Sequence, residues 1–113
     1  MTIISKQNNY LTFINVFTVE PVNQQKLVDL LTLATKSSVQ NITGFISSSL
    51  HRSLDGTKVT MYAQWRSMED YQNMRNNATA SPYLEQALEF AKFDPGMYEV
   101  VEIFSPGIKE QNE

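Results

Sequence analysis

A hairpin in the middle of the chain constrains the fold more than any other feature. Residues 45–53 and 57–66 are predicted strands, and Asp55-Gly56 between them fits a tight two-residue type I′ turn. The only His of the chain, His51, lies on the first of these strands, and the only Trp, Trp65, lies near the end of the second. The fold must therefore contain an antiparallel pair of strands with an indole near one end, either in a core or in the wall of a pocket.

One strand and one helix precede the hairpin, and two helices and a strand follow it. The order β-α-β-β-α-α-β is the split βαβ, ferredoxin-like plan of the α+β class, with helices on one face of an antiparallel sheet. At 113 residues we expect a single domain over 1–113, with its core at about 10–105 between polar tails. The further predicted elements are a strand over 10–19, a helix from Pro21 to about 39, a helix capped by Ser67 and Asp70 that reaches about 77, a helix from Ser81-Pro82 that Asp94-Pro95-Gly96 ends, and a strand over 97–104.

The first and last strands are apolar on both faces. A sheet of this plan has helices on one side only, so its second apolar face has no cover within the chain. We therefore expect a homodimer in which two sheets pack face to face. The alternating residues are Tyr98, Val100 and Phe104 against Met97, Val101 and Ile103 in the last strand, and Ile14 and Val16 against Leu11, Phe13, Phe17 and Val19 in the first.

Composition excludes several classes of function. The net charge of −3 gives no electrostatic reason to expect nucleic acid or an anionic membrane as a partner. With no Cys and one His, thiolate chemistry and Cys- or His-rich metal sites within one chain are excluded. Without a secretory leader, a membrane span, a phosphate-binding loop or a nucleophile elbow, we expect a cytoplasmic protein. An enzyme built from these residues has no metal and no bound redox cofactor.

Two residues break the apolar rows of their strands. Asn15 is the one amide among large apolar residues, and a buried amide without partners costs about 1–3 kcal/mol. It either bonds a neighbouring group or a water, or it points into a cavity. Trp65 shares a face with Val59, Met61 and Ala63, the side that we expect to face the helices. It is either a core residue or a pocket wall.

Proton transfer has one obvious candidate, His51. Histidine is the side chain best suited to that role near neutral pH, although a lone His is more often a surface residue. It shares a row with Phe45 and small serines, which would leave room opposite Trp65. On the following helix Tyr71 and Met74 either pack on the sheet or line a pocket roof, and we expect Arg75 to be solvated.

With these residues in view, the chain resembles the antibiotic biosynthesis monooxygenase (ABM) family of small dimeric α+β barrels, over about residues 10–105. The resemblance rests on the strand LTFINVFTV with Asn15, the Gly44-Phe45 start of the next strand, and the hairpin DGTKVTMYAQW with the Ser-initiated helix that carries Tyr71. The hairpin is similar to that of members that oxidise anthrone-like polyketide intermediates to quinones.

The resemblance implies a cofactor-independent monooxygenase that oxidises an electron-rich aromatic, anthrone- or phenol-like, to a quinone with dioxygen. It implies catalytic roles for Asn15, Trp65 and His51. Those enzymes tend to carry a second Asn four residues before the Trp, where this chain has Met61. A haem-degrading relative needs a ligating His after the third strand, and this chain has none there, so haem is set aside. The implied substrate-binding residues are Phe13, Phe17, Met61, Tyr62, Tyr71 and Met74.

Two other classes of function stay open on the same fold. One is an isomerase or another small-metabolite enzyme, which would use the same pocket and consume no oxygen. The other is a non-catalytic dimeric protein that binds a ligand or a partner. Met61 favours the latter, because it removes a polar group from the expected site.

Overall fold

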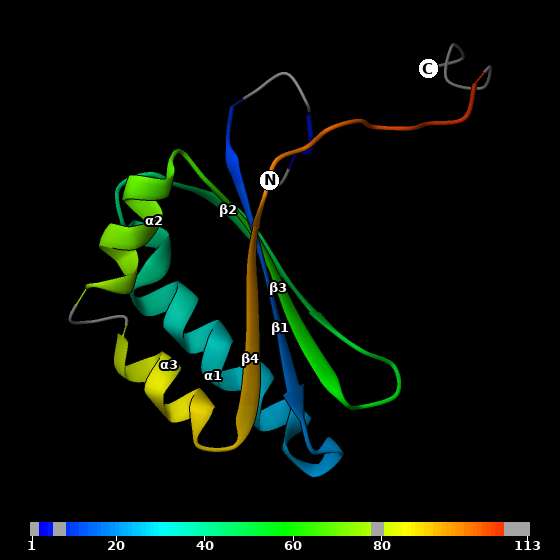
Figure 1. Ribbon diagram of the computed structural model, residues 1–113. Coiled ribbons are helices and arrows are strands. Elements are labelled where there is room, and N and C mark those ends of the chain that lie inside the picture. Colours follow the sequence, from blue (N-terminus) through cyan, green and yellow to red (C-terminus); the bar gives the residue numbers. More distant parts are fainter. Residues whose placement is uncertain (1–2, 6–8, 78–80, 108–113) are drawn as a thin grey trace.

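The computed structural model describes residues 3–5, 9–77 and 81–107. Four antiparallel strands form one sheet in the order β2-β3-β1-β4, and the helices of the described residues lie on one of its faces (Figure 1). The α+β class, the ferredoxin-like plan and the predicted order of elements are confirmed. The elements are β1 Leu11–Val19, the 3₁₀ turn η1 Pro21–Asn23, α1 Gln24–Ser37, the 3₁₀ turn η2 Val39–Asn41, β2 Phe45–Arg52, β3 Lys58–Trp65, α2 Met68–Arg75, α3 Ser81–Leu88 and β4 Ala91–Tyr98.

Apolar side chains fill the space between the sheet and the helices in two clusters. The first surrounds Phe17, Leu27 and Val59, which are at most 2% exposed. Leu27 belongs to the apolar stripe of α1, whose burial anchors that helix on the sheet. The second cluster lies toward the other end of the sheet, around Trp65 and Tyr71. Within the described residues, no helix is long and apolar enough to cross a membrane.

The hairpin turn is longer than the sequence predicts, because residues 53–57 connect β2 to β3. Gly56 has a φ of 84°, but no described non-glycine residue has a positive φ, so Asp55 does not adopt the type I′ conformation. The Asp55 carboxylate accepts hydrogen bonds from the N–H of Thr57 at 3.0 Å, the hydroxyl of Thr57 at 2.7 Å and the hydroxyl of Ser53 at 2.8 Å. These bonds hold the wider loop and, led by the Thr57 N–H, lower the pKa of Asp55 to about 2.

The last strand begins earlier than predicted. The segment 94–96 lies inside β4 and does not end a helix, and of the strand predicted over 97–104 only residues 97 and 98 belong to β4. β4 is an edge strand, where Pro95 is tolerated because its missing N–H can face away from the sheet. Phe93 holds this strand over the core, with its ring centroid 5.6 Å from that of Phe17.

Contacts at the start of α2 connect this helix to the residue that precedes β2 and to the residue that follows β3. The Ser67 hydroxyl accepts a hydrogen bond from the N–H of Asp70 at 3.1 Å and donates one to the Asp70 carboxylate at 3.0 Å, so the predicted cap is confirmed. The same carboxylate accepts two bonds from the Arg66 guanidinium, at 2.7 and 3.0 Å. Gly44, at the start of β2, has a φ of 91°, and a Cβ there would overlap Asp70. These contacts fix α2 relative to the hairpin.

Acid is expected to destabilise the protein through Asp70. The hydrogen bonds from Arg66 hold the pKa of Asp70 below its ordinary value; burial opposes this shift and Ser67 adds to it. Because the pKa is lower in the folded state, the stabilisation is complete above the unfolded value of about 4 and is lost as pH falls through the folded value. We expect Asp70→Asn to lower the melting temperature at pH 7 and to flatten its fall below about pH 4.

Circular dichroism melts from pH 7 to pH 2 measure this dependence. The pKa of Asp55 is lowered in the same direction, so the Asp55→Asn/Asp70→Asn double variant should show a still flatter curve. If the single Asp70→Asn variant keeps the wild-type slope, the Arg66 contact does not contribute to acid stability.

Candidate functional site

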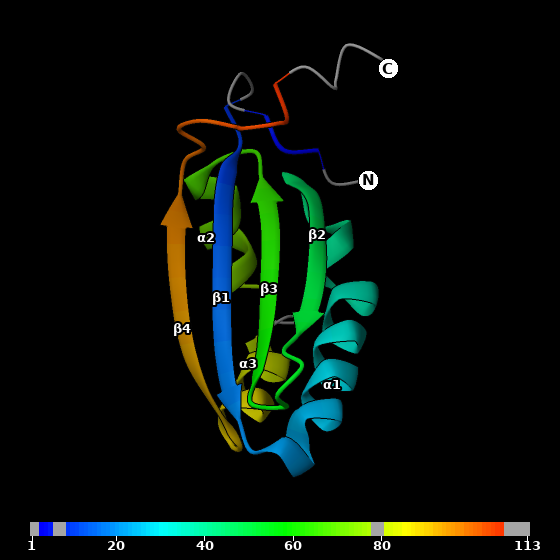
Figure 2. The ribbon, with the colours of Figure 1, turned by 90° about the vertical axis from the view of Figure 1, so that its right-hand side faces the viewer.

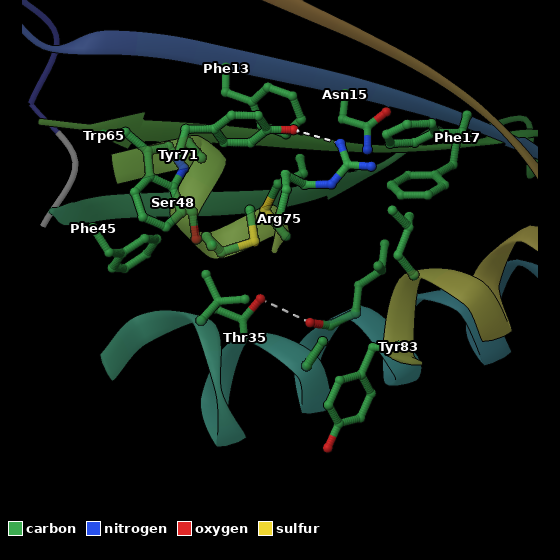
Figure 3. Close-up of a pocket in the computed structure, with 18 residues that line it drawn as sticks. Phe13, Asn15, Phe17, Thr35, Phe45, Ser48, Trp65, Tyr71, Arg75 and Tyr83 are labelled. Carbon is green, nitrogen blue, oxygen red and sulfur yellow. Dashed lines mark hydrogen bonds between the residues drawn. The ribbon is translucent and has the colours of Figure 1, made fainter. Parts of the chain in front are cut away.

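A cavity of about 110 Å³ lies between the sheet and the helices, lined by residues of both clusters, and is called the inner cavity below (Figure 3). Most of its wall is apolar or aromatic, as expected for a small-molecule site. The lining residues are Phe13, Asn15 and Phe17 of β1; Phe45 and Ser48 of β2; Met61, Ala63 and Trp65 of β3; Phe93 of β4; Leu31, Ala34, Thr35 and Val39 of α1 and η2; Tyr71, Met74 and Arg75 of α2; and Tyr83 and Leu84 of α3.

Asn15 presents an unsatisfied amide to the inner cavity. Its side chain is 4% exposed, and its Oδ1 has no hydrogen-bond partner among the described residues. The cross-strand register explains this, because Asn15 lies opposite Met61 on β3 and Pro95 on β4. Neither of those side chains carries a hydrogen-bond donor. A buried acceptor left in this state costs about 1–3 kcal/mol, so a ligand hydroxyl that donates to it would recover that energy.

Trp65 belongs both to the core and to the cavity wall. It is 1% exposed, and its ring meets those of Phe45 and Tyr71 edge-on, with centroids 5.4 and 6.0 Å apart. Tyr71 in turn packs against Phe13, with centroids 4.6 Å apart. These four rings form an aromatic box at one end of the inner cavity, and such walls suit a flat aromatic ligand.

Arg75 brings a positive charge to the wall of the same cavity, although the residue is exposed, as expected. Its Nη1 donates to the Tyr71 hydroxyl oxygen at 3.0 Å, and its guanidinium lies 5.6 Å from the centroid of Phe93 (Figure 3). The Tyr71 hydroxyl oxygen therefore accepts a hydrogen bond from Arg75, and the hydroxyl can donate its own proton in a hydrogen bond to another group. Of the described residues that line the inner cavity, Arg75 is the one charged side chain.

The predicted position of His51 is wrong. β2 has a bulge between Phe45 and Ser47, with Ile46 as the extra residue, and this reverses the alternation of the residues that follow. Ser48 therefore faces the inner cavity, whereas His51 is exposed on the other face of the sheet, with its Nε2 2.9 Å from the Ser49 hydroxyl. An imidazole there does not reach the inner cavity.

Tyr62, expected to bind substrate, also lies on the outer face of the sheet, opposite Ile14 and Ser49. Of the other predicted site residues, all line the inner cavity. Within the described ranges, no group of three or more His, Asp or Glu residues is placed to hold a metal ion. The predicted residues that line the inner cavity are Phe13, Asn15, Phe17, Met61, Trp65, Tyr71 and Met74.

Comparisons with known proteins identify the family of this chain. The family model described as antibiotic biosynthesis monooxygenase matches residues 11–87. Tetracenomycin-F1 monooxygenase of Streptomyces glaucescens is 34% identical over 104 residues, which cover 92% of this chain and 93% of that protein. The relation therefore spans nearly the whole of both chains.

Solved structures extend the comparison. The ActVA-Orf6 monooxygenase of Streptomyces coelicolor, solved in complex with nanaomycin D, is 28% identical, with a TM-score of 0.72 over 87% of this chain and 93% of that one. SnoaB, a cofactor-independent oxygenase from Streptomyces nogalater, is 16% identical, with a TM-score of 0.68 over 86% of this chain and 98% of that one. At that identity SnoaB supports the fold alone.

Proposed function

The chain belongs to the antibiotic biosynthesis monooxygenase family and is an enzyme of that class, and we propose that it oxidises an anthrone- or phenol-like aromatic to a quinone with dioxygen. The main support is Asn15, which lines an aromatic cavity and whose buried Oδ1 has no hydrogen-bond partner among the described residues. No metal or bound redox cofactor takes part in the proposed reaction.

The proposed reaction needs the substrate as an anion. Ground-state dioxygen is a triplet, so its direct reaction with a closed-shell molecule is spin-restricted. A delocalised aromatic enolate evades this restriction by passing one electron to oxygen, after which the two radicals combine. The resulting peroxide loses water: one oxygen atom becomes the new carbonyl, and the other leaves with the two hydrogens of the oxidised carbon. No external reductant is required.

The residues of the inner cavity have separate roles in this proposal. The amide N–H of Asn15 and the indole N–H of Trp65 donate to the enolate oxygen, while Asn15 Oδ1 accepts from a neighbouring substrate hydroxyl. Such donors in a water-poor site contribute roughly 3–4 kcal/mol each. Tyr71 replaces His51 in proton transfer. Its hydroxyl, whose oxygen accepts a hydrogen bond from Arg75, gives its proton to the peroxide and regains one from the oxidised carbon, and the hydroxide released takes up the proton that the substrate first lost to solvent.

An oxygen electrode with an anthrone substrate tests the proposal. We expect one dioxygen consumed per quinone formed, without added flavin or metal, and no oxygen released on addition of catalase. In Trp65→Phe, which keeps a ring and removes the N–H, kcat should fall roughly 10²-fold or more. Substrate turnover without oxygen uptake would indicate an isomerase instead, and binding without any turnover would indicate a ligand-binding protein.

We also propose a homodimer that forms through the outer face of the sheet and acts in the cytoplasm. Figure 2 shows this face, which no helix of the described residues covers. Ile14 and Val16 lie on it, and Tyr98 is 52% exposed there. The segment after β4 leads away from the body and exposes Val101 and Phe104 at 77% and 87%, although it is not the strand first expected (Figure 1).

Sedimentation equilibrium should therefore give twice the monomer mass of 12.9 kDa at micromolar concentration. Val16→Lys, on the outer face, should shift the equilibrium toward monomer. A wild-type protein that sediments as a monomer would contradict this part of the proposal.

A further inference from the structure

The inner cavity is smaller than the molecule that it is proposed to bind. Small-molecule sites usually measure about 300–1,000 Å³, whereas the inner cavity measures about 110 Å³. A second hollow of about 420 Å³, called the outer groove below, lies between α1 and the edge strand β2. Thr35, Phe45, Ser48 and Met61 line both spaces. The two spaces therefore share part of their walls.

Met61 is the most adaptable of the four side chains that line both spaces. It is half-buried on β3, directly between Asn15 of β1 and Leu50 of β2. Methionine is unbranched and has three rotatable side-chain bonds, so it changes shape at low cost. Phe45, by contrast, is packed against Trp65. A rotation of the Met61 side chain therefore changes the wall that the inner cavity and the outer groove share, without moving a strand.

The two spaces differ in polarity. The inner cavity is aromatic and apolar, whereas α1 contributes Thr32, Lys36 and Gln40 to the outer groove. No carboxylate is among the described residues that line the groove, so the charge of Lys36 is not balanced within it. A ligand that spans both spaces therefore has an apolar aromatic end and a polar or anionic end.

We propose that the inner cavity and the outer groove form one substrate site, and that Met61 is the gate that sets the length of substrate admitted. The substrate class is an elongated fused-ring aromatic. Its reacting ring lies beside Asn15 and Trp65, and its oxygenated far end lies near Lys36. The position of the reacting ring rests on the proposed function; the gate itself depends only on the cavities and is tested by binding.

Trp65 provides the readout, because it is the only Trp of the chain and lines the inner cavity. The probes are a two-ring hydroxynaphthoquinone and a four-ring hydroxynaphthacenequinone, with and without a carboxylate at the far end. Quinones suit this chain, because it has no cysteine to which they could add. Quenching of Trp65 fluorescence gives a Kd for each probe without any turnover.

Two substitutions of Met61 should change length selection in opposite directions. Met61→Ala removes the gate and is expected to tighten four-ring binding about 10-fold or more relative to two-ring binding. Met61→Ile keeps a similar volume but is stiff at χ1, so it should weaken four-ring binding selectively. Met74→Ala is the matched control, because Met74 lines the inner cavity only and its loss should affect both probes alike.

Lys36→Gln should weaken binding of the carboxylated four-ring probe and leave the uncharged four-ring probe unaffected, with Lys92→Gln on β4 as the control. Circular dichroism confirms that each variant is folded. If the four-ring to two-ring ratio of Kd is the same in wild type, Met61→Ala and Met61→Ile, the gate is refuted. If the ratio shifts as expected but no variant consumes oxygen, the gate stands and the proposed oxidation fails.

Discussion

Asn15→Leu is expected to give a protein that is more stable than wild type and nearly inactive. Leucine has a similar size and removes an amide oxygen that has no partner among the described residues, so the free energy of unfolding should rise by about 1–3 kcal/mol. The same substitution removes a donor from the enolate, so kcat should fall roughly 10²–10³-fold. Urea unfolding and oxygen uptake measure the two effects on the same sample.

A rise in stability together with a fall in kcat would distinguish a catalytic role of Asn15 from a structural one. Asn73→Leu is the matched control, because Asn73 is an exposed amide on α2, and it should leave kcat unchanged. A core amide that served the fold would lose stability and activity together when replaced. A fall in the stability of Asn15→Leu would therefore mean that Asn15 is bonded within the fold, and the catalytic assignment would lose its main support.

Gly44→Ala is expected to cause the largest loss of stability. Gly44 has a φ of 91°, in a region that costs other residues about 1–2 kcal/mol, and the new Cβ would overlap the side chain of Asp70. Displacement of Asp70 also disturbs its two hydrogen bonds with Ser67, the cap of α2, and loss of a helix cap costs about 1 kcal/mol. We expect the free energy of unfolding to fall by roughly 2–4 kcal/mol in urea titrations.

The matched control is Gly107→Ala, since no atom lies within 4 Å of where its Cβ would be. Because the clash is with the side chain of Asp70, its Cβ included, Gly44→Ala/Asp70→Gly should be less destabilised than the sum of its two single variants. Full additivity would show that backbone strain alone causes the loss.

The order of elements could be predicted from the sequence because periodicity and caps are local signals. The stripe of α1 and the Ser67 cap needed no tertiary information. β4 could not be found in this way, because Asp94-Pro95-Gly96 has the composition of a helix end. A proline is acceptable there only because β4 lies at the sheet edge, and edge position is a property of the whole fold.

The candidate site was predictable where strand alternation is unbroken. β1 and β3 pair with each other without a register shift, so Asn15 and Trp65 lie on the predicted face. On β2 no glycine at position 46 indicates the bulge, so the sequence predicts unbroken alternation and places His51 on the wrong face. Arg75 is exposed, as its polarity predicts, but its place in the cavity wall was missed, although the spacing of four residues from Tyr71 could have indicated the contact between them.

The bulge in β2 gives this strand one residue more than its partner needs. Ile46 is the extra residue, because Phe45 lies opposite Trp65 and Ser47 lies opposite the next residue of β3, Gln64. Loss of the Ile46 codon would therefore restore simple alternation and leave His51 on the outer face. Loss of the Ser49 codon, with the pairing of Ser47 and Ser48 kept, would instead bring His51 opposite Met61 and onto the face of the inner cavity. Genes that differ by three nucleotides at that point would encode proteins with and without an imidazole at the inner cavity.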